Sequence, residues 1–336
     1  MMRVLIFLLF SFHSRIPGAE APFTFQETHM GTLWTLKLYA SDQEKAGAAA
    51  RAAFGRIAEI DAIMSDYKPD SELSRLSATA GSGMAVAVRG DLLSVLSLSA
   101  AAAAESTGAF DITIGPCVQL WRSSRKSRQL PEPELLAAAR AATGWQAMHI
   151  KDSTVTLAKP GMKLDLGGIA KGWAQDAALS LVKEKHGITA AMLDAGGGVL
   201  VSGHPPDRAF WGVALAPFSD EQEEGRAVLL LKDAAVATSG DLFQSVSING
   251  QRYSHIIDPA TGLGMTRPVQ VSIVAPTGAL ADWLATAVCV MGPEKGIEWL
   301  RKTHPQVEAR AGMAVDGKVV IKETSGFADL LSKPAH

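Results

Sequence analysis

The chain has 336 residues, so at roughly 150 residues per domain it is long enough for two lobes or one large domain with a deep core. Hydrophobic residues make up 47% and charged residues 20%, which is ordinary globular usage and excludes a mainly disordered chain. Its 32 Lys and Arg residues against 34 Asp and Glu residues give a formal net charge of -2, so no overall positive field favours nucleic acid as a partner. The two cysteines, Cys117 and Cys289, are too few for a disulfide scaffold or a four-thiolate zinc site; the sequence allows them to pair or to stay reduced.

The N-terminal segment has the pattern of a secretory leader. Arg3 precedes a short apolar run at 4–10, and an Ala-x-Ala motif ends at Ala21. The run is much shorter than the roughly 20 residues that span a bilayer, so we expect residues 1–21 to be a signal peptide. The alternatives are a first strand or a retained anchor.

Residues 22–336 are expected to form one exported domain, in which two lobes are allowed but no separable linker is seen. The apolar runs at 272–275 and 287–291 are too short to span a membrane, so we expect no transmembrane span in the mature chain. These features together predict a periplasmic protein, associated with the inner membrane if the leader is kept as an anchor.

The first half of the chain predicts mainly helices. Apolar residues at three-and-four spacing indicate amphipathic helices over 43–63 and 91–106, with Gly108 as the stop of the second. Residues 64–73 are turn-rich and should form a loop that leads into a short helix. Residues 122–134 lack apolar periodicity and are expected to be an exposed connection; their four basic residues fit a solvated loop better than a phosphate-binding patch.

The second half predicts a mixture of strands and helices. A short strand is expected at 163–166 and a helix over 170–185, which Gly187 would end. Another helix is predicted over 277–291, and the next begins near Glu294. Because several strands are joined by turns rather than by helices, the pattern favours an α+β fold. The expected strands are 188–194, 199–202, 210–216, 227–231, 234–238, 269–275 and 317–321.

A glycine-containing turn between the strand at 163–166 and the following helix is the first candidate for chemistry. The segment Asp165-Leu-Gly-Gly-Ile-Ala-Lys-Gly172 lets the backbone amides after Gly168 approach an anion at a helix N-terminus, and Lys171 adds a positive charge. It matches neither a P-loop nor a dinucleotide fingerprint. A tight strand-to-helix turn would need the same glycines.

Asp282 and Thr286 are the second candidate. On a helix they are four residues apart, so a carboxylate and a hydroxyl lie on one face. Two such oxygens suit Mg²⁺, which keeps waters or substrate phosphates in its other positions. Without a metal, Asp282 would serve the helix N-terminus and Thr286 would bond to a main-chain carbonyl.

His255 is the third candidate. It lies among apolar residues near Asp258, and a histidine beside a carboxylate can accept a proton near neutral pH. A hydrogen-bonded core histidine is the alternative. A fourth segment, Leu193-Asp-Ala-Gly-Gly-Gly198, follows a strand, and its glycines would let a ligand or another backbone come close.

These segments occur in order with Met64-Ser-Asp-Tyr67-Lys-Pro-x-Ser-Glu-Leu73, Gly108-Ala-Phe-Asp111 and Thr238-Ser-Gly-Asp241. Together they resemble the ApbE-type flavin transferases, the FAD:protein FMN transferases, over roughly residues 25–325. The resemblance implies an α+β fold with mixed sheets and helices around a flavin-nucleotide cleft. It also implies Mg²⁺-dependent transfer of FMN from FAD to a Thr or Ser hydroxyl of an exported flavoprotein subunit, with release of AMP.

Site residues follow from the same resemblance. Asp282, Thr286 and the main-chain carbonyl of Ala170 match the family's metal ligands, and His255 matches its functionally required histidine. Tyr67 matches the aromatic residue that stacks on the isoalloxazine ring. The remaining matches at or beside flavin-nucleotide contacts are Met30, Ala109, Phe110, Asp111, Asp165, Lys171 and Ile256.

The chain departs from the family pattern at two positions that concern the details of FAD binding. Ser77 stands where many members have Asn, and Gly198 stands where Asn or Asp often closes the glycine motif. The family's acceptors belong to membrane-bound redox complexes and carry a Ser/Thr-Gly-Ala-Thr-like motif. An FAD pyrophosphatase that gives FMN and AMP, and an exported protein that binds FAD without cleaving it, are the alternative functions.

Overall fold

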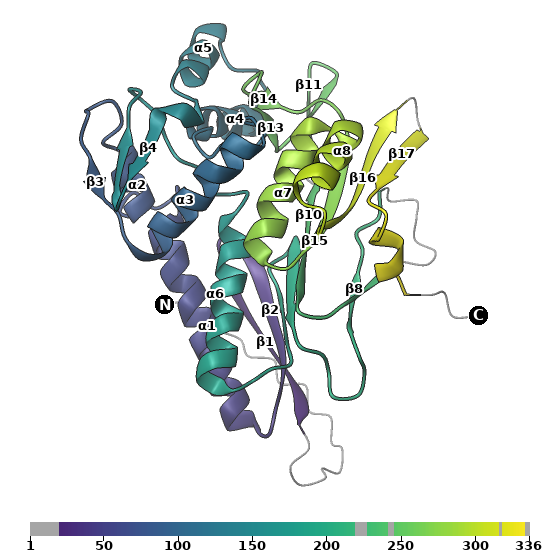
Figure 1. Ribbon diagram of the computed structural model, residues 1–336. Helices are drawn as coiled ribbons and strands as arrows, with labels where there is room; N and C mark the ends of the chain where they lie inside the picture. Colours follow the sequence, from purple (N-terminus) through teal and green to yellow (C-terminus); the bar gives the residue numbers. More distant parts are fainter. Residues whose placement is uncertain (1–19, 219–226, 241–244, 316–317, 333–336) are drawn as a thin grey trace.

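The computed structural model describes residues 20–218, 227–240, 245–315 and 318–332 (Figure 1). The predicted leader lies almost wholly outside these residues, and the first strand already begins at Ala21. None of the described helices is both long and apolar enough to cross a membrane.

An antiparallel eight-stranded sheet is the centre of the fold, with strand order β1-β2-β6-β7-β10-β15-β16-β17. It includes strands from both ends of the described chain, so the sheet cannot be completed until the C-terminal strands have paired. Its strands are β1 (Ala21–His29), β2 (Thr32–Ala40), β6 (Ala191–Asp194), β7 (Gly198–Ser202), β10 (Ala234–Gly240), β15 (Val269–Ala275), β16 (Glu308–Val315) and β17 (Lys318–Glu323).

Both faces of this sheet are covered, which explains why β15 is buried along its whole length. Side chains alternate between the faces. Val271 and Ile273 join the large core beneath the helices, whereas Val274 packs in a second core with Trp211 and Phe327. The covering elements on that second side are β8 (Trp211–Ala214), β9 (Val228–Leu231) and a 3-10 turn, η2 (Phe327–Leu330).

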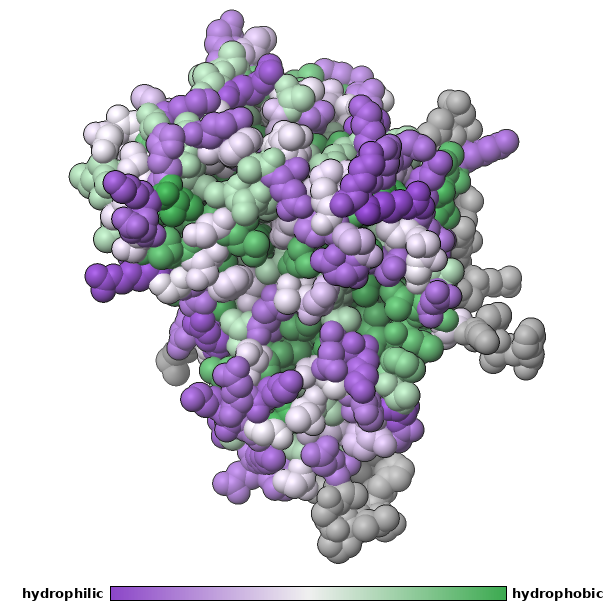
Figure 2. All heavy atoms as spheres, in the orientation of Figure 1, coloured by the Kyte–Doolittle hydropathy of each residue, from purple (hydrophilic) through white to green (hydrophobic). Residues whose placement is uncertain are grey.

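Helices α1, α6 and α7 lie side by side over the first face (Figure 1). Figure 2 shows hydrophilic residues spread over the visible surface, with apolar residues between them. The helices are α1 (Gln43–Met64), α2 (Glu72–Ser77), α3 (Gly90–Glu105), α4 (Gly115–Ser127), α5 (Pro133–Ala141), α6 (Ala170–His186), α7 (Gly278–Met291) and α8 (Pro293–Thr303), with a 3-10 turn η1 (Trp145–Ala147).

Smaller sheets complete the fold around the ends of the main sheet. One contains β3 (Val86–Ala87), β5 (Thr154–Leu157) and β4 (Met148–Lys151). Two hairpins pack near α4: β11 (Ser245–Ile248) with β12 (Gln251–Ser254), and β13 (Ile257–Asp258) with β14 (Leu263–Gly264). The expected α+β class is confirmed.

Most of the predicted helices are found within two residues of their expected ends. Helix α6 ends as predicted at Gly187, whose φ of 60° is left-handed and whose N–H bonds to the Lys183 carbonyl. Residues 163–166 do not form the predicted strand, because Lys163 makes only an isolated bridge to Ile114. Cys117 and Cys289 are both buried and are not joined in a disulfide.

The predicted exposed connection at 122–134 is wrong at both ends, because residues 122–127 belong to α4 and residues 133–134 begin α5. Helix α4 buries Cys117, Trp121 and Ser124, at spacings of four and three residues. The Trp121 indole also donates a hydrogen bond to the Ser254 carbonyl at 2.9 Å. The basic residues after Trp121 show no apolar periodicity, so the sequence did not indicate that the helix continues through them. The helix ends soon afterwards, with Arg128 as its C-cap at a left-handed φ of 58°.

Two glycines let α6 and α7 touch backbone to backbone. A Cβ atom added at Gly172 would lie 2.1 Å from the carbonyl oxygen of Gly278, and one added at Gly278 would lie 2.6 Å from the carbonyl oxygen of Gly172. Only glycine fits both positions, since real Cβ contacts are essentially never this short. The contact fixes how close the two helices lie.

Replacing Gly172 by Ala should therefore lower stability by about 1–3 kcal/mol, the usual cost of overpacking. Gly55→Ala is the matched control: Gly55 is an exposed residue inside α1 with nothing within 4 Å of an added Cβ, so it should gain about 0.5–1 kcal/mol. Urea denaturation of both variants measures the difference. Equal stabilities would show that the helices can separate at no cost.

Candidate active site

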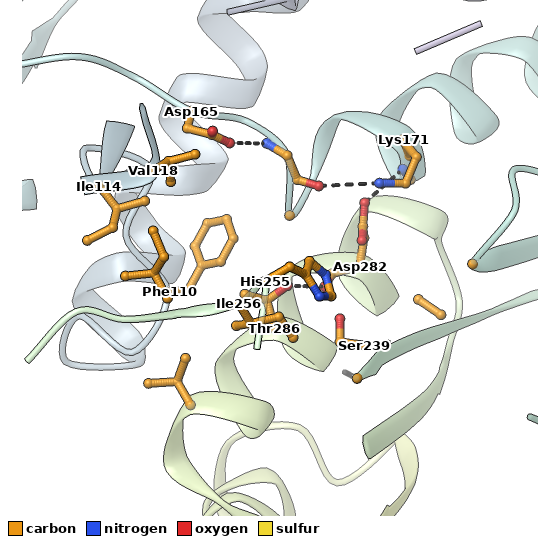
Figure 3. A pocket seen from close by; sticks show the side chains of 18 of the residues that line it. Phe110, Ile114, Val118, Asp165, Lys171, Ser239, His255, Ile256, Asp282 and Thr286 are labelled. Carbon is orange, nitrogen blue, oxygen red and sulfur yellow. Dashed lines mark hydrogen bonds between the residues drawn. The ribbon is translucent and has the colours of Figure 1, made fainter. Parts of the chain in front are cut away.

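A cavity of about 640 Å³ opens where α6, α7, α4 and the ends of β7 and β10 meet. Figure 3 shows side chains from distant parts of the sequence pointing into it, including His255, Asp282 and Thr286. The predicted site residues that line this cavity are Tyr67, Ala109, Phe110, Asp111, Asp165, Lys171, His255, Ile256, Asp282 and Thr286.

Two predicted residues do not line the cavity. Met30 lies in the turn between β1 and β2 with a φ of 47°, and its side chain packs against the main core. Ala170 is the first residue of α6 and its side chain is buried in the same core, so only its main chain could serve a ligand.

The glycine-containing turn is held by its own hydrogen bonds. Asp165 accepts the Gly167 N–H at 2.7 Å, and the Leu166 carbonyl accepts those of Ile169 and Ala170 at 3.0 and 2.9 Å. The expectation that the amides after Gly168 bind an anion is therefore wrong for these positions. Among the described residues, the amides of Gly168 and Lys171 have no acceptor, and the Lys171 ammonium group lies beside the turn, 3.4 Å from the Gly167 carbonyl.

Asp282 and Thr286 face this turn from α7. Asp282 accepts the Gly172 N–H at 3.1 Å, and an added Cβ at Gly168 would lie 2.9 Å from the Thr286 hydroxyl oxygen. Burial raises the pKa of Asp282 above its usual value, although the positive charge of Lys171 and the Gly172 N–H act in the opposite direction. A cation near this carboxylate would favour its charged form.

These groups fit a hard divalent cation that is completed by a substrate. The Thr286 hydroxyl donates to the Asp282 carbonyl at 3.3 Å, as the metal-free interpretation expected, and this leaves the lone pairs of the hydroxyl oxygen available. The described residues contain no cluster of three or more His, Cys, Asp or Glu side chains that could hold a metal alone. A cation here would need oxygens from the main chain and from the substrate.

His255 points into the same cavity as Asp282 and Thr286 (Figure 3). The nearby Asp258 does not line the cavity. One of its carboxylate oxygens accepts the Ala260 N–H at 2.9 Å and so shapes the turn after β13. Of these two residues, His255 lines the cavity and Asp258 does not.

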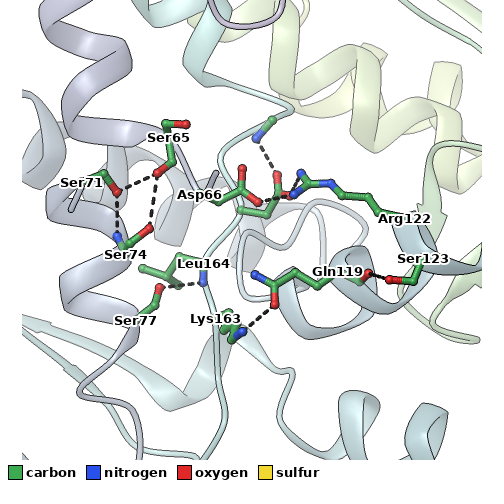
Figure 4. Close-up of polar contacts among 12 residues, drawn as sticks. Ser65, Asp66, Ser71, Ser74, Ser77, Gln119, Arg122, Ser123, Lys163 and Leu164 are labelled. Atoms are coloured by element: carbon green, nitrogen blue, oxygen red, sulfur yellow. Dashed lines mark hydrogen bonds and ion pairs between the residues drawn. The ribbon is translucent and has the colours of Figure 1, made fainter. Parts of the chain in front are cut away.

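Arg122 lines the cavity, although the sequence analysis assigned it to a solvated basic loop. Its guanidinium group pairs with Asp66 (Figure 4) and, at 2.8 Å, with Asp165. It also lies 4.1 Å from the centre of the Tyr67 ring. Tyr67 as a whole residue is 74% exposed, so its ring is accessible to a planar ligand. Burial and the charge of Asp66 raise the pKa of Asp165, against the effect of Arg122.

The carboxylate of Asp111 is bound by groups of the protein itself. It accepts hydrogen bonds from the Thr113 N–H and hydroxyl at 2.8 and 2.7 Å and from the Trp145 N–H at 3.1 Å. Burial nevertheless raises its pKa. Phe110, beside it, contacts the cavity and packs against Trp283, with ring centres 5.9 Å apart.

Two buried glutamines also line the cavity and were not predicted. The Gln175 amide nitrogen donates to the carbonyls of Leu193 and Gly198, both at 2.9 Å, and that of Gln270 donates to Ala216 and Pro217. Because carbonyls only accept, these bonds fix the orientation of both amides. Nothing in the sequence distinguishes these positions on α6 and β15 from other positions in the core.

The two departures from the family pattern have different surroundings. Ser77 does not line the cavity; its hydroxyl accepts the Leu164 N–H at 3.2 Å and anchors the chain just before Asp165 (Figure 4). Gly198 does line it, and an added Cβ would be 3.5 Å from the Gln175 side-chain oxygen. Asp241, from the Thr238-Ser-Gly-Asp motif, lies outside the described residues.

Solved structures resemble this chain along nearly its whole length. The flavin transferase ApbE from Vibrio cholerae has a TM-score of 0.83 at 30% identity and covers 93% of this chain and 100% of its own. The apo form of the Pseudomonas stutzeri flavinyl transferase ApbE has a TM-score of 0.82 at 26% identity, with coverage of 94% and 99%.

Sequence comparison agrees. A Klebsiella pneumoniae protein named FAD:protein FMN transferase is 30% identical over 310 residues, which cover 90% of this chain and 85% of its own. A Vibrio cholerae protein of the same name is 36% identical over 242 residues, 71% and 72% of the two chains. The model of the ApbE family matches residues 30–311. Because the family model and these relatives match most of the chain, this chain belongs to the ApbE family.

Proposed function

We propose that this chain transfers the FMN part of FAD to a Thr or Ser hydroxyl of an exported flavoprotein subunit of a membrane redox complex, with Mg²⁺ at the site and AMP as the leaving group. Relatives named FAD:protein FMN transferase, similar along most of the chain, support the transfer of FMN to a protein. The Mg²⁺ requirement and the residue roles rest on the cavity.

The observation that carries the proposal is the meeting of three kinds of group in one cavity. Tyr67 offers an accessible aromatic ring, Lys171 and the open amides of the turn offer positive charge and donors, and Asp282 with Thr286 offers oxygen ligands. A flavin dinucleotide has a planar ring system joined to a pyrophosphate, so its parts match these groups in chemistry.

In the proposed reaction the chain binds FAD so that its pyrophosphate meets the turn before α6, where Lys171 and the amides of Gly168 and Lys171 bind phosphate oxygens. Asp282, Thr286 and the Ala170 carbonyl would hold Mg²⁺, which when bound neutralises charge on the bridging and leaving oxygens. His255 takes the proton of the acceptor hydroxyl. The acceptor oxygen then bonds to the FMN phosphorus as the pyrophosphate bond breaks, and AMP departs.

The decisive experiment incubates the purified chain with FAD, Mg²⁺ and an acceptor domain carrying the Ser/Thr-Gly-Ala-Thr-like motif. In-gel flavin fluorescence of the denatured acceptor would demonstrate transfer. Free FMN and AMP without labelled acceptor would mean a pyrophosphatase, and unchanged FAD would mean a binding protein. Either of these results would overturn the proposal.

We also propose export to the periplasm, supported by the basic start, the short apolar run and the Ala-x-Ala motif before residue 22. N-terminal sequencing of the protein from an exporting host should give a chain that starts after Ala21. A periplasmic protein that still begins at Met1 would mean a retained anchor, and recovery in the cytoplasm would contradict export.

Asp282→Ala should abolish Mg²⁺-dependent turnover while the protein stays folded, because Asp282 supplies the only carboxylate in the proposed ligand set. Initial rates over a range of Mg²⁺ concentrations, together with a thermal melt, test this. Thr286→Val should have a milder effect, since it removes a neutral hydroxyl at nearly constant volume. Unchanged activity of Asp282→Ala at limiting Mg²⁺ would remove this residue from the site.

His255→Asn should lower the transfer rate by about 10²–10⁴-fold, the usual contribution of a general base, and leave FAD affinity nearly unchanged. If His255 were only a core residue, the same change would cost about 1–3 kcal/mol of stability and spare the rate per folded molecule. Single-turnover transfer, FAD binding and the thermal midpoint of one variant distinguish the two roles. A normal rate in the folded variant decides against catalysis.

A further inference from the structure

Asp176 is a half-buried carboxylate to which neither the sequence nor the proposed reaction gives a role. It lies on α6, one turn after Gly172, and its two oxygens accept the N–H groups of Gly278 and Ala279 at 2.6 and 2.9 Å. Those amides open α7. The first N–H groups of a helix have no partner within the helix and carry its positive dipole end, so an acidic side chain is favoured there.

This contact joins the two halves of the proposed metal site. Helix α6 begins with Ala170, whose carbonyl is one proposed ligand, and α7 carries Asp282 and Thr286. Gly172 touches Gly278 directly and donates to Asp282 at 3.1 Å. Asp176 therefore binds the end of α7 that lies only four residues before Asp282.

Helix α7 also has a cap from its own sequence, which binds a different amide. The Thr277 hydroxyl accepts the Leu280 N–H at 3.2 Å, so α7 has an N-cap made from its own sequence. Thr277 fixes the local conformation of α7, whereas Asp176 fixes α7 against α6. The glycine contact already fixes how close the helices lie, and a side chain that spans them with two hydrogen bonds sets the position of one along the other.

We propose that Asp176 is a positioning residue: it holds α7 in register with α6, so that Asp282, Thr286 and the Ala170 carbonyl are spaced for Mg²⁺ and the FAD pyrophosphate. The inference rests on the proposed function. Asp176 does not touch the substrate, since it does not line the cavity. Mg²⁺ demands near-ideal geometry, so a small slip of α7 should weaken metal binding far more than nucleotide binding.

Asp176→Asn tests this with nearly constant side-chain volume. Its amide oxygen can accept one of the two N–H groups, but its NH₂ group would face the other donor. The Mg²⁺ concentration for half-maximal effect should rise tenfold or more, whereas FAD affinity without Mg²⁺ should stay within about twofold. Two readouts are needed: the transfer rate, and the increase in thermal midpoint that Mg²⁺ produces at saturating FAD.

Thr277→Ala is the matched control, because it removes the other cap of α7 and leaves the bond between the helices intact. It should lower the thermal midpoint without changing the Mg²⁺ requirement. If both variants lose stability and both keep the wild-type Mg²⁺ requirement, Asp176 is only a cap and the inference is overturned. A wild type that shows no Mg²⁺ effect would instead contradict the proposed function.

If Asp176→Asn does not fold, the wild type still gives a test by amide hydrogen exchange. Mg²⁺ held between α6 and α7 should tighten their contact, so the Gly278 and Ala279 amides should exchange more slowly with FAD and Mg²⁺ together than with FAD alone. Equal exchange in the two conditions would count against the coupling.

Discussion

The backbone contact between α6 and α7 is the constraint on which the site depends. Gly172 and Gly278 bring the helices closer than any side chain would allow, and the Gly172 N–H then reaches the Asp282 carboxylate on the neighbouring helix. Ordinary helix packing keeps axes 8–10 Å apart through interlocking side chains. Here main-chain atoms themselves meet, so a donor from one helix and a carboxylate from the other can share one cavity wall.

Three carboxylates in or next to the cavity are largely withdrawn from solvent, and each is held differently. Arg122 and a main-chain N–H bind Asp165, the start of a helix binds Asp176, and a single N–H with the nearby charge of Lys171 acts on Asp282. Burial raises the pKa of all three, and that of Asp176 reaches about 6. Asp282 has the fewest protein donors, which agrees with its proposed role as a ligand for a cation.

How far the sequence could predict this structure depends on the range of the interactions. Gly187 ends α6 through its own left-handed φ, and Asp282 and Thr286 share a face through helix periodicity; both are local and were predictable. Arg122 meets Asp66 and Asp165 only after three distant segments pack together, and no local pattern records that. Met30 was assigned from the resemblance alone; in the structure it has a left-handed φ and its side chain packs against the core.

Helix α5 contrasts with the helices of the central layer, because none of its side chains is buried. Its packing partner is α4, and Arg140 ties it to the turn after His255 by a 2.8 Å hydrogen bond to the Ala260 carbonyl. Substitutions in α5 should therefore change the stability of the fold less than substitutions in α6 or α7. Among related chains this helix should diverge faster than α6 and α7, although Arg140 still connects it to the segment that follows His255.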